Sequence, residues 1–145
     1  MSTRIRRAYP WDVAACARIL WAAVEEAEWM ARSRSREEER KLLARMVRQG
    51  WVRVARVEGR IVGFISVENT HVHGLYLLPN ARGQGIAAQL MKTAQTKASR
   101  LTLYAHAANA RARRFYAAQG FRPVAIGAGN DEGLTEIRLE WERSA

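Results

Sequence analysis

The sequence predicts a single α/β domain in which about four helices flank a mixed central sheet of about seven strands. Three observations point to this class. The 145-residue chain has the usual size of one domain. Runs rich in β-forming residues alternate with segments of helical periodicity. Strands joined by a hairpin come first, and a strand–helix–strand unit follows in the middle. We therefore expect residues 1–145 to form one domain without a repeat or a linker.

The first third of the chain is predicted to contain one strand and two helices. Residues 3–7 form the strand, and the first helix begins at residues 10–12 with Asp12 as its N-cap. Its buried face consists of apolar residues at helical spacing, which are Val13, Cys16, Ala17, Leu20, Val24 and Ala27. The capping-box pattern of residues 35–38 begins the second helix, which Gly50 ends.

The remaining elements alternate between strands and helices. Strands are predicted at residues 51–57, 61–68, 71–77, 101–105, 121–126 and 134–141. Residues 58–60 join the first two of these as a hairpin, and Pro79 ends the third. Helices are predicted over residues 85–98 and 109–119, the second closed by Gly120.

The composition bears on where the protein acts and on the kind of partner it binds. No run of about 18 apolar residues is present, so no transmembrane helix is predicted, and no secretory signal is visible at the N-terminus. The single cysteine, Cys16, cannot form an internal disulfide or a zinc site, which favours a core role and a reducing, cytoplasmic location. The net charge of +10 is spread along the chain rather than gathered in a tail. We interpret it as a general surface property, part of which attracts an anionic cofactor.

A glycine-containing loop lies between a predicted strand and a predicted helix. Its residues are Arg82, Gly83, Gln84, Gly85, Ile86 and Ala87. Such a loop presents several backbone N–H groups at the positive end of a helix and so predicts an anion site. The sequence has neither the Gly-Lys-Ser/Thr of a Walker loop nor the Gly-x-Gly-x-x-Gly of a dinucleotide site.

The spacing Arg82-x-x-Gly85-x-Ala87 resembles the pyrophosphate-binding motif of the GNAT superfamily of N-acetyltransferases. Two flanking segments are also similar to that superfamily. They are Leu75-Tyr76-Leu77-Leu78-Pro79 before the loop and Asn109-x-x-Ala112-x-x-Phe115-Tyr116-x-x-x-Gly120-Phe121 after it. The chain looks most like bacterial members of unassigned substrate.

This resemblance implies a GNAT fold and an acetyl-CoA-dependent transfer to a primary amine, by direct attack in a ternary complex and without a metal. The pantetheine arm would pair with the strand before the loop, Asn109 would contact that arm, and Tyr116 would support the departing thiol. The donor-binding residues so implied are Leu75, Leu77, Arg82, Gly83, Gln84, Gly85, Ile86, Ala87, Asn109 and Tyr116. Tyrosine titrates near pKa 10 and a thiol near 8.5, so complete proton transfer to the thiolate is uphill by roughly 2 kcal/mol and a hydrogen bond is at least as plausible.

The general base is open. Tyr104 stands where some relatives carry a glutamate, so a simple carboxylate base is in doubt. His71 and His73 are the candidates instead, because histidine titrates near 6.5, and strand alternation would put both on the face of Leu75 and Leu77. A solvated polar strand end is the alternative for the two histidines, and Glu68 is a weaker third candidate.

The acceptor would lie against two further segments. Trp29 and Met30 could wall a pocket between the first two helices, and Asn130, Asp131 and Glu132 could hold a cationic amine; plain surface turns are the alternative for both segments. Two other functions compete with catalysis, namely an acyl-CoA sensor of the same fold and a basic nucleic-acid-binding domain. A homodimer is possible, as dimers are common in the family.

Overall fold

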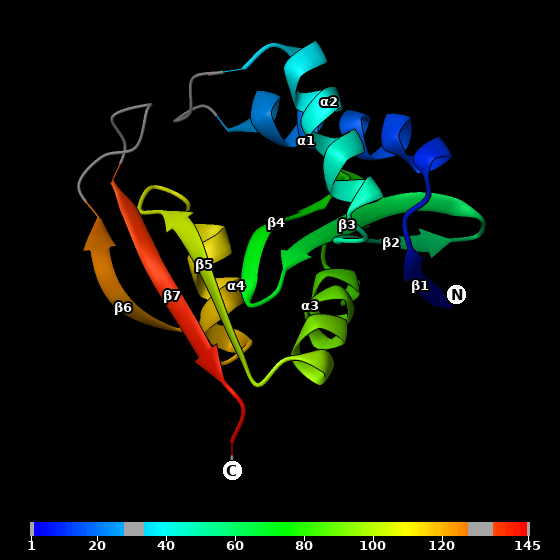
Figure 1. Ribbon diagram of the computed structural model, residues 1–145. Coiled ribbons are helices and arrows are strands. Elements are labelled where there is room, and N and C mark those ends of the chain that lie inside the picture. Colours follow the sequence, from blue (N-terminus) through cyan, green and yellow to red (C-terminus); the bar gives the residue numbers. More distant parts are fainter. Residues whose placement is uncertain (1, 28–33, 128–134, 145) are drawn as a thin grey trace.

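Seven strands form one sheet in the order β1-β2-β3-β4-β5-β7-β6 in the part of the chain that the structure describes (Figure 1). The structure is a computed structural model that describes residues 2–27, 34–127 and 135–144. The elements are β1 (Thr3–Arg7), η1 (Pro10–Asp12), α1 (Val13–Glu26), α2 (Arg36–Arg48), β2 (Val52–Val57), β3 (Arg60–Glu68), β4 (His71–Leu77), η2 (Pro79–Ala81), α3 (Ile86–Lys97), β5 (Arg100–His106), α4 (Ala110–Ala118), β6 (Arg122–Gly127) and β7 (Glu136–Glu142). The predicted mixed α/β fold is confirmed.

The sheet is antiparallel on both sides of one parallel pair. β1 to β4 pair with their neighbours in antiparallel fashion, as do β5, β7 and β6. β4 and β5 are parallel, and α3 makes the connection between them, which is the predicted strand–helix–strand unit. The glycine loop follows β4 and the helix of Asn109 and Tyr116 follows β5, so both predicted donor-binding segments adjoin this pair.

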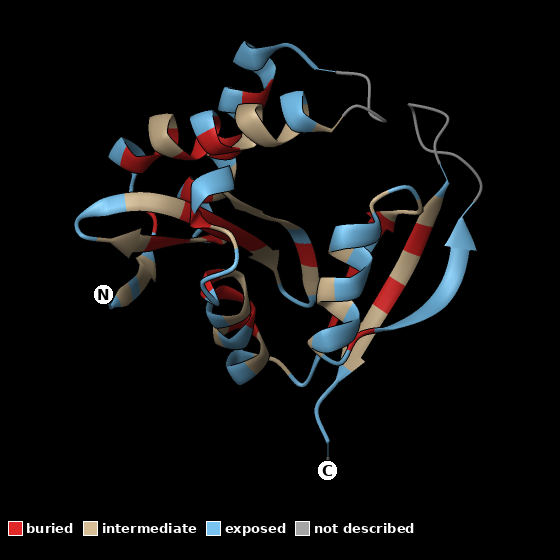
Figure 2. Cartoon of the chain, turned by 180° about the vertical axis from the view of Figure 1, so that it is seen from behind, coloured by how far each residue is buried: buried red, intermediate tan, exposed pale blue. Residues whose placement is uncertain are grey.

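Two apolar clusters fill the space between the sheet and its helices. α1 and α2 cover one face, where Cys16, Leu43 and Phe64 are almost completely buried. α3 and α4 lie against the other face, where Leu90 and Met91 pack on the strands. The predicted core role of Cys16 is confirmed, and burial raises its pKa to about 12, so the thiol is unreactive. α4 and β6 contain no buried residue among those described and form the pale outer part of Figure 2.

Local sequence signals place the ends of several elements. Ser35 and Glu38 form the predicted capping box at the start of α2. The Ser35 N–H donates to Glu38 Oε1 at 3.0 Å, and the Glu38 N–H donates to Ser35 Oγ at 3.1 Å. Gly50, which follows α2, has a φ of +78°. The turn between β2 and β3 is a two-residue hairpin turn in which Glu58 and Gly59 both have positive φ, 51° and 78°.

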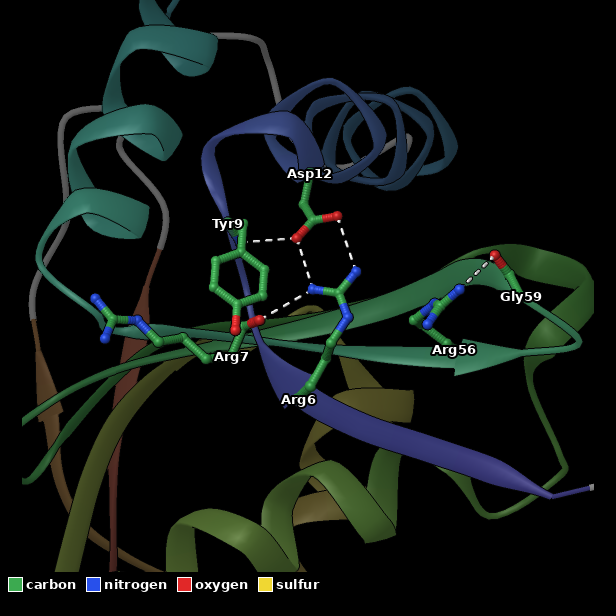
Figure 3. Close-up of polar contacts among 6 residues, drawn as sticks. All are labelled: Arg6, Arg7, Tyr9, Asp12, Arg56 and Gly59. Atoms are coloured by element: carbon green, nitrogen blue, oxygen red, sulfur yellow. Dashed lines mark hydrogen bonds and ion pairs between the residues drawn. The ribbon is translucent and has the colours of Figure 1, made fainter.

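The predicted N-cap role of Asp12 is only half right. Asp12 occupies the N-cap position of α1, but its side chain accepts no hydrogen bond from that helix. The residue already has helical φ and ψ as the last residue of η1, so its carboxylate turns back toward the preceding turn. There it accepts from the Tyr9 backbone N–H at 2.7 Å and from both terminal nitrogens of Arg6 at 2.8 and 3.1 Å (Figure 3).

We expect Asp12→Asn to lower the free energy of unfolding by roughly 2 kcal/mol, since it replaces a buried charge-assisted pair. Burial opposes ionisation of Asp12, but the hydrogen bonds from Arg6 and the Tyr9 N–H outweigh it and hold its pKa below the ordinary value. The stabilisation is therefore present above pH 4 and is lost as the pH falls through the lowered pKa. Urea unfolding of both proteins at pH 7 and pH 3 measures this, and an equal difference at both pH values would contradict it.

Candidate active site

The parallel strands β4 and β5 separate over most of their length. Their ladder is limited to the pair His71–Thr102, beside which the Thr102 N–H donates to the Thr70 carbonyl at 2.7 Å. Beyond that point the two strands diverge toward their carboxyl ends (Figure 1). α3 follows β4 and α4 follows β5, so both helices begin at this edge of the sheet. Ligands of open α/β sheets bind at such an edge.

The backbone of β4 offers hydrogen bonds toward this separation. The Leu78 N–H donates to the Val62 carbonyl at 2.8 Å, and so it points toward β3. Successive residues of a strand point their N–H and C=O groups to opposite sides. The backbone groups of Leu75 and Leu77 therefore face away from β3 and toward the separation, as the predicted pantetheine-binding role requires.

The loop between β4 and α3 leaves a row of N–H groups available. Gly83 and Gly85 have φ values of +77° and +79°, and Gly85 is the N-cap of α3. Within the described residues, the N–H groups of residues 83–87, which include Gln84, Ile86 and Ala87, have no backbone or side-chain acceptor. A Cβ built on Gly83 or Gly85 would meet no protein atom within 4 Å. The loop thus has the geometry of an anion site at the start of a twelve-residue helix.

Arg82, which begins this loop, pairs with an acidic side chain that no sequence motif indicates. Its Nη1 lies 2.6 Å from Oε1 of Glu26, the last residue of α1. The same oxygen lies 3.4 Å from Nη1 of Arg111, in the first turn of α4. No sequence motif indicates Glu26 or Arg111, because only the fold brings α1, the glycine loop and α4 together.

Asn109 and Tyr116 occupy the helix α4, on the other side of the separation. Asn109 is the N-cap, and its Oδ1 accepts from the Ala112 N–H at 3.1 Å. Its side-chain amide N–H groups have no partner among the described residues. Tyr116 is half-buried. The centroid of its ring lies 5.4 Å from that of the Phe115 ring and 5.7 Å from that of the Phe121 ring.

The Tyr116 hydroxyl makes no hydrogen bond in the described part of the chain. Burial, and in second place the phenol of Tyr76, raises the pKa of Tyr116 above its ordinary value of 10.0. The hydroxyl is therefore protonated throughout the physiological pH range. It can donate a hydrogen bond, but complete transfer of its proton is even less favourable than for a free tyrosine.

The predicted orientation of His71 and His73 is wrong. Ser66 of β3 pairs with Gly74, but the next residue, Val67, pairs with Val72, so β4 contains a bulge at His73. The bulge reverses the alternation. Val72 joins the core under α3 together with Leu75 and Leu77, whereas Tyr76 packs toward α1 and α2.

The two histidines therefore share the opposite face, with ring centroids 4.9 Å apart. His71 Nδ1 lies 3.4 Å from Thr102 Oγ1, and its ring lies 5.8 Å from that of the exposed Tyr104. Burial is the main cause that lowers the pKa of His71, and His73 adds to it. His73 Nε2 lies 2.9 Å from Glu68 Oε1, so Glu68 contacts His73 rather than standing apart as a third base.

The predicted acceptor residues Trp29, Met30, Asn130 and Asp131, with Glu132, lie outside the described residues. Among residues 2–27, 34–127 and 135–144, no group of three or more His, Cys, Asp or Glu side chains has the arrangement of a metal site. No helix in this part of the chain is long and apolar enough to cross a membrane.

Comparison with known proteins places these segments in one family. Residues 17–143 match the acetyltransferase (GNAT) domain family. An uncharacterized N-acetyltransferase of Archaeoglobus fulgidus is 35% identical over 97 residues, which are 55% of this chain and 66% of that protein. The peptidyl-lysine N-acetyltransferase YjaB of Salmonella typhimurium is 35% identical over 72 residues, half of each chain. The chain thus spans slightly less than two thirds of the length of the first of these relatives.

A solved structure has the same fold. The PaiA N-acetyltransferase of Thermoplasma acidophilum, in complex with coenzyme A, superposes with a TM-score of 0.75 at 18% identity. The superposition covers 99% of this chain and 100% of that one.

Proposed function

The chain belongs to the GNAT acetyltransferase family, and on that premise we propose that it transfers an acetyl group from acetyl-CoA to a primary amine by direct attack in a ternary complex. The observation that carries this proposal is the separation of β4 from β5, between the loop N–H groups and the Tyr116 hydroxyl, none of which has a hydrogen-bond partner among the described residues. The coenzyme A in the complex of the PaiA relative supports a donor of the same kind.

The donor would lie along the separation. Its pyrophosphate would rest on Arg82 and on the N–H groups of residues 83–87, where glycines give the backbone a close approach. The pantetheine arm would pair with Leu75 and Leu77, whose backbone groups face the same space. Asn109 would direct toward that arm its side-chain amide N–H groups, which have no partner within residues 2–27, 34–127 and 135–144. This arrangement would bring the thioester between β4 and Tyr116.

The reaction needs a neutral amine and a stabilised thiolate. The amine nitrogen attacks the thioester carbonyl carbon, so that a C–N bond forms, the C–S bond breaks and coenzyme A leaves as the thiolate. The proton of the attacking nitrogen passes to a base, and Tyr116 donates a hydrogen bond to the sulfur as its charge develops. For a lysine-like acceptor, deprotonation at pH 7 costs roughly 4–5 kcal/mol, which a nearby base offsets in part.

His71 is the base that we favour. It faces the side of the sheet that α1 and α2 partly cover, next to Thr102 and Tyr104. Its lowered pKa keeps the imidazole neutral at pH 7, so that it can accept the proton directly or through water. His73, paired with Glu68, would relay that proton onward.

We expect kcat/KM of the wild type to fall as the pH drops below 6.5, because protonated His71 cannot accept a proton. In His71→Ala this break should be absent, kcat/KM should instead rise with pH as the acceptor amine loses its proton, and its value at pH 7 should be lower by about tenfold or more. Tyr104→Phe, which keeps the ring beside His71, should retain the break. Profiles from pH 5 to 8 for the three proteins test this, and the same break in His71→Ala would exclude the histidine.

The acceptor class is tested with a panel of amines. Peptidyl lysine belongs in it because YjaB carries that description, and polyamines, amino acids, aminoglycosides and peptide N-termini complete it. Release of coenzyme A together with acetylation of one class, shown by mass spectrometry, would support the proposed function. Binding of acetyl-CoA without transfer to any member would support a sensor, and DNA binding that resists moderate salt would support a nucleic-acid-binding domain.

A further inference from the structure

The carboxylate of Glu26 joins the starts of both helices that border the separated strands. It lies 2.6 Å from Arg82, at the loop that precedes α3, and 3.4 Å from Arg111, in the first turn of α4. Glu26 is 42% exposed and Arg82 29%, so the contact lies at the surface of the molecule and is open to solvent. A carboxylate thus already contacts arginines that lie near the starts of both helices.

Glu26 stands at an unfavourable place in its own helix. It is the last residue of α1, whose last turn contains Glu25 and Glu26 and no basic residue. Carboxylates at a helix C-terminus are repelled by the helix dipole, at roughly 0.3–1 kcal/mol for an exposed group. The arginines of two other segments compensate Glu26, and a local rule broken in this way is typical of functional positions.

The same two arginines match the charge of an acyl-CoA donor. Arg82 opens the loop whose N–H groups have no acceptor in the described part of the chain, so a phosphate on that loop would come within reach of its guanidinium. Arg111 lies on the facing helix and reaches the same carboxylate oxygen. A phosphate group and the Glu26 carboxylate would therefore compete for the same donors.

We propose that Glu26 is an internal competitor of the donor phosphates and that Arg111 is a second phosphate contact beside Arg82. This inference rests on the proposed acetyl-CoA-dependent function. In the unliganded chain Glu26 holds the two arginines together across the separation. Donor binding replaces the carboxylate by phosphate and frees the end of α1.

Calorimetric titration with coenzyme A tests the proposal. Glu26→Gln should bind about fivefold more tightly than the wild type, which corresponds to the upper range for an exposed ion pair. Glu25→Gln is the matched control, because it removes the same charge from the adjacent position but contacts Arg36 instead of Arg82. It should bind within about twofold of the wild type. Arg111→Gln should weaken binding, and Glu26→Gln should give much less gain in the Arg111→Gln background.

The possible results distinguish a failure of this inference from a failure of the proposed acetyl-CoA-dependent function. Equal gains in Glu26→Gln and Glu25→Gln would overturn the inference, because the effect would then be one of net charge alone. Unchanged binding in Arg111→Gln would remove Arg111 from the site. In both cases binding by the wild type would leave the proposed donor intact. No binding of coenzyme A by the wild type or by any variant would overturn the proposed function and this inference together.

Discussion

Tyr116→Phe is expected to lower the turnover number by tens-fold or more while the affinity for acetyl-CoA stays within about twofold. The hydroxyl has no hydrogen-bond partner among the described residues, so its contribution would come only when the sulfur of the donor develops charge. Its raised pKa keeps it protonated and makes it a hydrogen-bond donor rather than a strong acid. The loss should therefore be nearly independent of pH between 6 and 9.

The measurement is steady-state kinetics with the best acceptor of the amine panel, together with calorimetry for the donor. Urea unfolding is the control for folding. Since the substitution removes no hydrogen bond within the described chain, the free energy of unfolding should change by less than about 1 kcal/mol. An unchanged turnover number would remove Tyr116 from the mechanism, and a comparable loss of donor affinity would assign it to binding.

The elements of the fold could be predicted from the sequence because their signals are local. The capping box at Ser35 and the positive-φ glycines, such as Gly50 and Gly85, mark helix ends where the structure has them. The pairing of β4 with β5 follows from the strand–helix–strand order between them. Each of these signals acts over a few residues and needs no knowledge of distant contacts.

The bulge in β4 could not be predicted from alternation alone, because it depends on the register with β3. Gly74 is the signal that could have indicated it, since a glycine inside a strand often marks a bulge or a close approach. A Cβ at Gly74 would lie 2.5 Å from the Tyr76 ring, so position 74 has no room for a side chain. The bulge turns His71 and His73 away from the face of Leu75 and Leu77.

The contacts among three distant segments could not be predicted from the sequence either. Glu26, Arg82 and Arg111 belong to α1, the glycine loop and α4. In a chain with 24 basic and 14 acidic residues, many such pairings are possible, and no spacing rule selects this one. Only the order of the strands in the sheet brings the starts of α3 and α4 to one edge.

Gly85→Ala is expected to weaken binding of coenzyme A by about tenfold to thirtyfold. Gly85 has a φ of +79° at the N-cap of α3, in the left-handed region that disfavours an L side chain by about 1 kcal/mol. If the backbone relaxes, the adjacent N–H groups turn away from the phosphate. If it does not, the new methyl group projects into space that is free of protein atoms within 4 Å, where the phosphate would lie.

Gly59→Ala is the matched control for backbone strain. Gly59 has a φ of +78° in the turn between β2 and β3, and its added Cβ would make an ordinary contact of 3.8 Å with Arg56. Both variants should therefore lose about 1 kcal/mol of unfolding free energy, while only Gly85→Ala loses affinity for coenzyme A. Equal affinities in the two variants would show that the phosphates do not rest on this part of the loop. Because strain is matched, a difference between them reports on the anion site itself.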